Sequence, residues 1–203
     1  GRREPGGLRG TACAEGPVPE PPPGGFAPSG PTTAPSAAPS DEQAVRFLAQ
    51  STFGATTSEI DRLKRLGYSD WIEQQFLIPR TSHLDFVLAV YPLPTPEDVT
   101  VTIDPLYQTF WKQAVSAPDP LRQRVTFALS QIFVTSAADA ALQTAPHTLA
   151  SYLDTLSKHA FGSYREMLEE VSKHPAMGQY LTWLANRGDG GRVPDENYAR
   201  EVM

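Results

Sequence analysis

The chain has 203 residues, including 20 prolines, 15 glycines and one cysteine, and its formal net charge is −6. This mildly acidic balance makes nucleic acid an unlikely partner, because a general nucleic-acid binder needs a cationic face. A single cysteine excludes a disulfide framework and any multi-cysteine zinc or iron–sulfur site made by this chain alone. No apolar run approaches the ~20 residues that span a bilayer, so the sequence predicts no transmembrane segment.

Residues 1–40 differ in composition from the remainder. They hold 10 of the prolines and 8 of the glycines, with few large apolar side chains. Such a segment cannot offset the entropy of ordering its backbone, so we predict a disordered leader or tether. Cys13 follows two small residues and resembles the lipid-attachment cysteine of a bacterial lipoprotein. It is equally compatible with an ordinary thiol, because no apolar signal segment precedes it.

From residue 41 the apolar residues recur with the period of an α-helix, and no window alternates with period two. Helix starts are predicted where a capping residue or a proline precedes an apolar stripe. In chain order these starts are Ser40 with Gln43, Thr56 with Glu59, Ser69, His83, Asp104-Pro105, Asp119-Pro120, Pro146, Ser163 with Glu166, Pro175 and Pro194. Predicted stops are Gly67, Pro79, Gly162 and Gly188. The fold class is therefore all-α, with antiparallel helices over residues 41–203.

The clearest apolar stripe follows Asp119-Pro120 and is predicted to face the core. Its members are Leu121, Val125, Ala128, Leu129, Ile132 and Phe133. Arg122, Gln123 and Arg124 are predicted on the opposite, solvated side.

Several segments resemble one bacterial family, the domain of unknown function 1800. They are AVRFLAQSTFG (44–54), GYSDWIEQQF (67–76), DPLRQRVTFALSQIFVTS (119–136), ASYLDTLSKHAFGSYREMLEEVSKHPAMG (150–178) and PDENYAREVM (194–203). The resemblance implies a bacterial protein, often exported, with no established activity and no catalytic residue to transfer. It also implies that the last helix continues beyond residue 203, so we expect a helical domain truncated at its C-terminal end.

Two residues have the spacing of a metal pair. Glu170 and His174 are four apart on one predicted helix, which places both on one face. The alternative for His174 is a cap at the helix C-terminus, where an imidazole bonds free carbonyl groups.

Other polar residues of the last third are weaker candidates for chemistry. The candidate catalytic residues are His159, His174 and Glu201, with His159 predicted to turn toward the core. Asp195, Asn197 and Tyr198 are candidate ligand-binding residues, because the last predicted helix is dense in polar groups. The pairs Asp154–Lys158 and Glu196–Arg200 are predicted to be ordinary solvated helix pairs.

The common catalytic signatures are missing from the sequence, including the HExxH helix, the P-loop and the nucleophile elbow. Two functions remain open, and the cofactor is unknown for both. The first is an exported, periplasmic or envelope-associated binding or scaffold component with a protein partner in the cell envelope. The second is a hydrolase-like or metal-dependent enzyme whose His/carboxylate site is completed by residues beyond this chain.

Overall fold

We describe the protein from a computed structural model that covers residues 38–191 and 193–202. The predicted leader up to residue 37, with the candidate lipidation site Cys13, lies outside the described residues. Within the described part the chain forms only helices, which confirms the all-α prediction. None of these helices is both long and apolar enough to cross a membrane.

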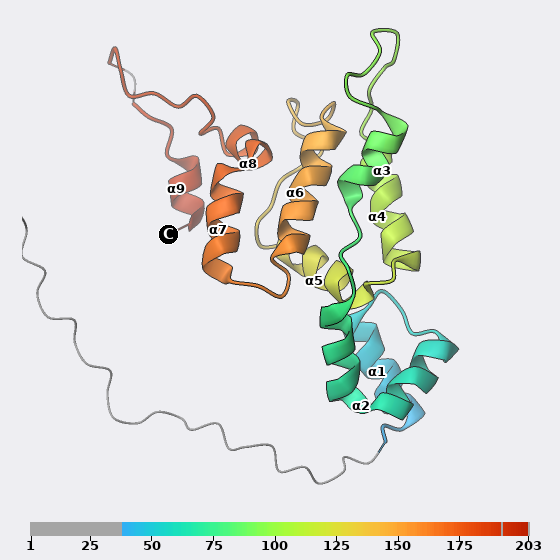
Figure 1. The fold of residues 1–203 in the computed structure, drawn as a ribbon. Helices are drawn as coiled ribbons and strands as arrows, with labels where there is room; N and C mark the ends of the chain where they lie inside the picture. The colour runs from blue at the N-terminus through green and yellow to red at the C-terminus, as the bar shows by residue number, and fades with distance from the viewer. Residues whose placement is uncertain (1–37, 192, 203) are drawn as a thin grey trace, which may run out of the picture. The chain divides into compact units, whose positions relative to one another are not determined.

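The helices follow one another through mostly short connections, with three longer ones between α3 and α4, between α5 and α6, and between α8 and α9 (Figure 1). Their bounds are α1 Asp41–Ser51, α2 Thr57–Leu77, α3 His83–Val90, α4 Asp104–Ser116, α5 Pro120–Ser130, α6 Pro146–Lys158, α7 Tyr164–Lys173, α8 Pro175–Tyr180 and α9 Asn197–Val202.

Local sequence signals determine most helix starts. Ser40 and Gln43 form the predicted capping box of α1, and the hydroxyls of Thr56 and Ser163 accept backbone N–H groups at the starts of α2 and α7. The predicted stop at Gly67 is a break inside α2, where φ is 78°. A left-handed backbone favours glycine, so the sequence locates this bend correctly.

Two apolar clusters hold the helices together. The smaller one joins α1 to α2 through Ala44, Leu48, Leu63 and Trp71. The larger one surrounds α6, which packs against α3, α4, α5, α7 and α8 (Figure 1). Because neighbours cover α6 on several sides, its polar residues are buried along with its apolar ones: Asp154 and Ser157 are 8% and 0% exposed.

The predicted inward stripe of α5 is partly wrong. Leu121, Leu129 and Phe133 do pack against the two clusters, but the fully buried residues of α5 are Gln123 and Thr126. The remaining stripe residues are not part of the core. Val125 is half-buried, Ala128 is exposed, and Ile132 lies beyond the helix end and is 69% exposed. The physical reason is that α5 contacts α1, α2, α4 and α6, so a polar side of the helix is buried as well.

Three other boundaries differ from prediction. Helix α4 begins at Asp104 itself with Ile103 as its N-cap, and no side chain caps it. Helix α8 ends at Tyr180 instead of near Gly188, and Thr182 and Ala185 have positive φ angles of 58° and 59°. The last helix begins at Asn197, not at Pro194.

Candidate functional site

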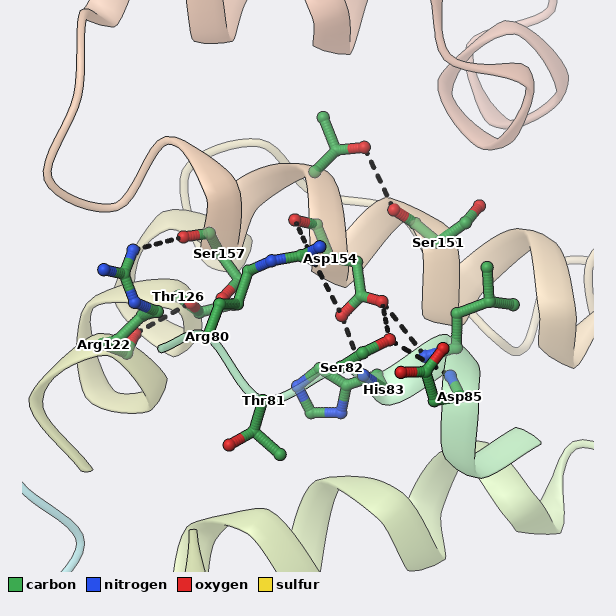
Figure 2. Close-up of polar contacts among 12 residues, drawn as sticks. Arg80, Thr81, Ser82, His83, Asp85, Arg122, Thr126, Ser151, Asp154 and Ser157 are labelled. Atoms are coloured by element: carbon green, nitrogen blue, oxygen red, sulfur yellow. Dashed lines mark hydrogen bonds and ion pairs between the residues drawn. The ribbon is translucent and has the colours of Figure 1, made fainter. Parts of the chain in front are cut away.

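A cluster of buried polar groups lies where the start of α3 packs beside α6 (Figure 2). The Asp154 carboxylate accepts hydrogen bonds from the Ser82 hydroxyl at 2.5 Å, the His83 backbone N–H at 2.8 Å and the Leu84 backbone N–H at 3.2 Å. The first N–H groups of a helix have no partner within it, and a carboxylate is well suited to satisfy them. Asp154 therefore fixes the start of α3 against α6.

The same arrangement corrects the predicted Asp154–Lys158 surface pair. Asp154 is buried, and its ionic partner is Arg80, at 3.6 Å. Lys158 instead pairs with Glu170 of α7, at 2.5 Å. The prediction was wrong because it treated one side of α6 as solvated, whereas helices pack around it.

His83 lies at the centre of a directed chain of hydrogen bonds. Its Nε2 is 3.2 Å from Gln123 Oε1, and the Gln123 amide group donates to Asp119 at 3.1 Å. A carboxylate only accepts, so the Gln123 amide must face Asp119, and His83 Nε2–H must donate to the Gln123 oxygen. His83 Nδ1 is then the acceptor for the Thr109 hydroxyl, at 3.4 Å.

The imidazole of His83 is neutral in this setting. The residue is 2% exposed, and burial lowers the pKa of His83, although the Asp154 carboxylate acts in the opposite direction. Protonation of Nδ1 would place a second N–H toward Thr109, which already accepts a hydrogen bond from Gln113 at 3.1 Å. The geometry thus favours a single neutral tautomer.

Next to His83 lies a cavity of about 460 Å³, which we call the aromatic cavity. Its walls come from α4, α5 and the segment after α1, with His83 and Leu153 also in the lining. Five aromatic side chains contribute to the lining: Phe53, Tyr107, Phe110, Trp111 and Phe127. The volume falls in the ~300–1,000 Å³ range of small-molecule sites.

The aromatic walls support one another. The rings of Phe53, Phe110 and Phe127 have mutual centroid separations of 5.8–5.9 Å. The Arg124 guanidinium lies 5.4 Å from the Phe53 centroid and 5.6 Å from that of Phe127, a cation–π arrangement. These contacts keep the walls in place, while Trp111 at 65% exposure forms part of an open rim.

Several polar side chains of this cavity are already engaged within the protein. His83 and Gln123 bond each other, the Thr126 hydroxyl donates to the Arg122 carbonyl, and the Ser130 hydroxyl donates to the Phe127 carbonyl. What the lining offers a ligand is therefore mainly apolar and aromatic surface.

The predicted metal pair is divided between two sets of contacts. His159 Nε2 lies 3.1 Å from Glu170 Oε2, without a well-aligned hydrogen bond, and Lys158 binds the other oxygen of the same carboxylate. The pKa of Glu170 is lowered by its hydrogen bond with Lys158 and further by His159. Glu170 thus faces His159 and Lys158 across the α6–α7 packing.

His174 faces elsewhere. It leaves the helix after Lys173, its Nδ1 accepts the Ala176 N–H to cap α8, and its Nε2 lies 3.1 Å from the Ser151 hydroxyl. Burial lowers the pKa of His174. Among residues 38–191 and 193–202, no three His, Cys, Asp or Glu side chains converge in a way that could hold a metal ion.

The candidate ligand-binding residues surround the start of α9. Asp195 accepts the Asn197 backbone N–H at 2.9 Å, which lowers the pKa of Asp195, and a hydrogen bond with Thr182 adds to that shift. The Asn197 amide reaches Thr182 at 3.0 Å, so both residues cap and anchor this helix. Tyr198 bonds the Ser172 hydroxyl and is half-buried against the larger core.

Glu201 is exposed on α9 and lines a separate cavity of about 280 Å³ together with Tyr198. Glu196 and Arg200 form the predicted surface pair. His159, His174 and Glu201 do not share a contact within the described residues, and each has its own surroundings.

A family model described as "Protein of unknown function (DUF1800)" matches residues 46–203. The chain belongs to this family. The match confirms the resemblance inferred from the sequence and covers every residue of the polar cluster and the aromatic cavity. Comparison with curated proteins and with solved structures gives no match.

In this DUF1800 chain, sequence reasoning missed the His83 cluster and the aromatic cavity. Asp119 was identified as a helix cap, but its carboxylate bonds the Thr81 backbone N–H at 3.0 Å and hydroxyl at 2.7 Å. A usable signal was the run Arg80-Thr81-Ser82-His83, four polar residues at the entry to an apolar helix. In the fold, Asp119 bonds Thr81, and Asp154 bonds Ser82 and the His83 backbone. Both acidic residues belong to distant parts of the chain.

Proposed function

We propose that this protein is a binding component of the bacterial cell envelope and that the aromatic cavity holds an apolar part of its ligand. The observation that carries the proposal is the lining: five aromatic side chains surround about 460 Å³, and His83, Gln123, Thr126 and Ser130 already form hydrogen bonds within the protein. An apolar group entering this space loses water without breaking protein hydrogen bonds. The envelope location is proposed from the resemblance alone.

The binding part of the proposal is testable with a neutral fluorescent probe, N-phenyl-1-naphthylamine. We expect saturable binding with enhanced probe fluorescence, and a several-fold weaker affinity in Trp111→Ala, which removes the exposed rim. Tyr164→Ala is the matched control, because Tyr164 is also 65% exposed but lines a different cavity. Equal losses in both variants, or no saturable binding to the parent protein, would contradict the proposal.

The location is tested on the complete protein in its host by cell fractionation and protease accessibility. The proposal expects the protein in the envelope or periplasmic fraction. Recovery with cytoplasmic markers only would refute it.

A second candidate function is a hydrolase-like or metal-dependent enzyme. It is supported by the contact between His159 and the Glu170 carboxylate, with Lys158 on the same carboxylate. Glu170→Gln in the complete protein should then abolish activity or metal content while leaving the thermal transition unchanged. If Glu170→Gln unfolds and the parent protein shows no measurable activity or metal content, these residues have a structural role.

A further inference from the structure

The aromatic cavity has a neighbour on each side. It shares Phe53 and Ala114 with a cavity of about 560 Å³, which we call the Gln75 cavity. It shares lining residues with another of about 180 Å³, which we call the Tyr152 cavity; these are Leu106, Ser130, Gln131 and Leu153. Shared walls place the three cavities in sequence along α4.

The length of this sequence of cavities follows from the helix. Leu106 lines the Tyr152 end, Ala114 the junction with the Gln75 cavity, and Val115 the Gln75 cavity. Nine helical steps from Leu106 to Val115 correspond to about 14 Å. A compact ring would fill only the aromatic cavity, whereas a linear chain would follow all three.

The Gln75 cavity differs in having a buried hydrogen-bond donor without a partner. Gln75 is 1% exposed, and its side-chain oxygen accepts a long hydrogen bond from the Leu121 N–H at 3.5 Å. Its amide nitrogen has no partner among the described residues. Buried donors are normally satisfied, so this amide favours an acceptor oxygen.

The charged groups of the Gln75 cavity are paired. Arg62 lies 3.3 Å from Glu59 and donates to Gln74 at 2.8 Å, and the Trp71 indole donates to Glu59 at 3.0 Å. The cavity therefore offers a free amide donor beside a neutralised ion pair. An uncharged acceptor such as a carbonyl oxygen suits this environment.

We propose that the ligand is a linear aliphatic chain with a hydrogen-bond acceptor at one end. The acceptor oxygen takes the Gln75 amide N–H, and the chain passes Phe53 and Ala114 into the aromatic cavity and onward to the Tyr152 cavity. This rests on the proposed binding function and specifies the class of its ligand.

The first experiment measures displacement of N-phenyl-1-naphthylamine by straight-chain methyl ketones from hexan-2-one to tetradecan-2-one. We expect the affinity to rise roughly fourfold per methylene until the cavities are filled. Matched 1-alkenes, which lack the carbonyl, should bind about 5–10-fold more weakly at each length, the usual effect of one hydrogen bond.

Two variants locate the chain. Ala114→Phe narrows the junction and should abolish the advantage of the longer ketones, while Ala49→Phe on the exposed side of α1 should not. Gln75→Met keeps the length of the side chain and should remove the preference for ketones over alkenes. If Ala114→Phe does not fold, the Gln75→Met comparison still decides the position of the acceptor.

Failure of this inference is distinct from failure of the proposed function. Probe binding that ketones displace equally at all lengths, or a ketone preference that survives Gln75→Met, would overturn the linear ligand and leave the aromatic cavity as a binding site. Absence of any probe binding would overturn both.

Discussion

The most demanding prediction concerns Asp154, because its carboxylate connects α6 to the start of α3. Asp154→Ala removes three hydrogen bonds and leaves the His83 and Leu84 N–H groups without their partner. We discount the ion pair with Arg80, because that side chain is 37% exposed and solvent weakens the interaction. Each buried donor left without an acceptor costs about 1–3 kcal/mol, so the two N–H groups together should lower the free energy of unfolding by about 2–6 kcal/mol.

The assay is urea-induced unfolding followed by circular dichroism, with the free energy of unfolding extrapolated to water. Asp154→Asn should lower the free energy of unfolding by less than Asp154→Ala, because the amide oxygen can still accept a hydrogen bond from the start of α3. Asp85→Asn is the control: Asp85 is exposed in the first turn of the same helix, and its loss should cost only about 0.3–1 kcal/mol. If Asp154→Ala costs no more than Asp85→Asn, the carboxylate does not stabilise the start of α3 and the reasoning is refuted.

Two further predictions test the backbone and the buried imidazoles. Gly67→Ala should lower the free energy of unfolding by about 1 kcal/mol, because φ is 78° there. Gly54→Ala is the control and should have little effect, since an added Cβ has nothing within 4 Å at either site. Equal effects of the two substitutions would argue against backbone strain at Gly67. Burial lowers the pKa values of His83 and His174, so the unfolded chain binds more protons than the folded one. The contribution of these two residues to the free energy of unfolding should therefore be fully present above about pH 6.5 and decrease as the pH falls below it. Urea unfolding of a His83→Gln, His174→Asn variant between pH 5 and 7 should show a weaker slope; an unchanged slope would assign the dependence to other groups.

Local capping signals made much of the helical order predictable. The hydroxyls of Ser40, Thr56 and Ser163 cap the helices that follow them, and Gly67 bends the chain where a left-handed residue is required. Each of these features depends on a few neighbouring residues, so one sequence is sufficient to locate it.

The buried polar cluster depends on contacts that sequence periodicity does not record. Gln123 looked solvated because charged residues flank it, yet it lies between His83 and Asp119, which come from other parts of the chain. Asp154 was misplaced for a related reason: a helix covered on several sides has no fully solvated face. Periodicity indicates one buried face, whereas the burial of α5 and α6 depends on how many helices surround them.

The polar cluster and the aromatic cavity are physically connected through the helices that form both. Thr109 and Gln113 belong to α4, Gln123 to α5 and His83 to α3, and their hydrogen bonds have one consistent direction set by the Asp119 carboxylate. A buried network whose hydrogen bonds run in only one direction favours the helix arrangement in which those bonds form. Because the cavity walls lie on the same turns of α4 and α5, the network fixes the spacing of the aromatic side chains without offering a polar atom of its own to the ligand. The specificity of the cavity then comes from its shape and from the free amide N–H of Gln75 beyond the junction.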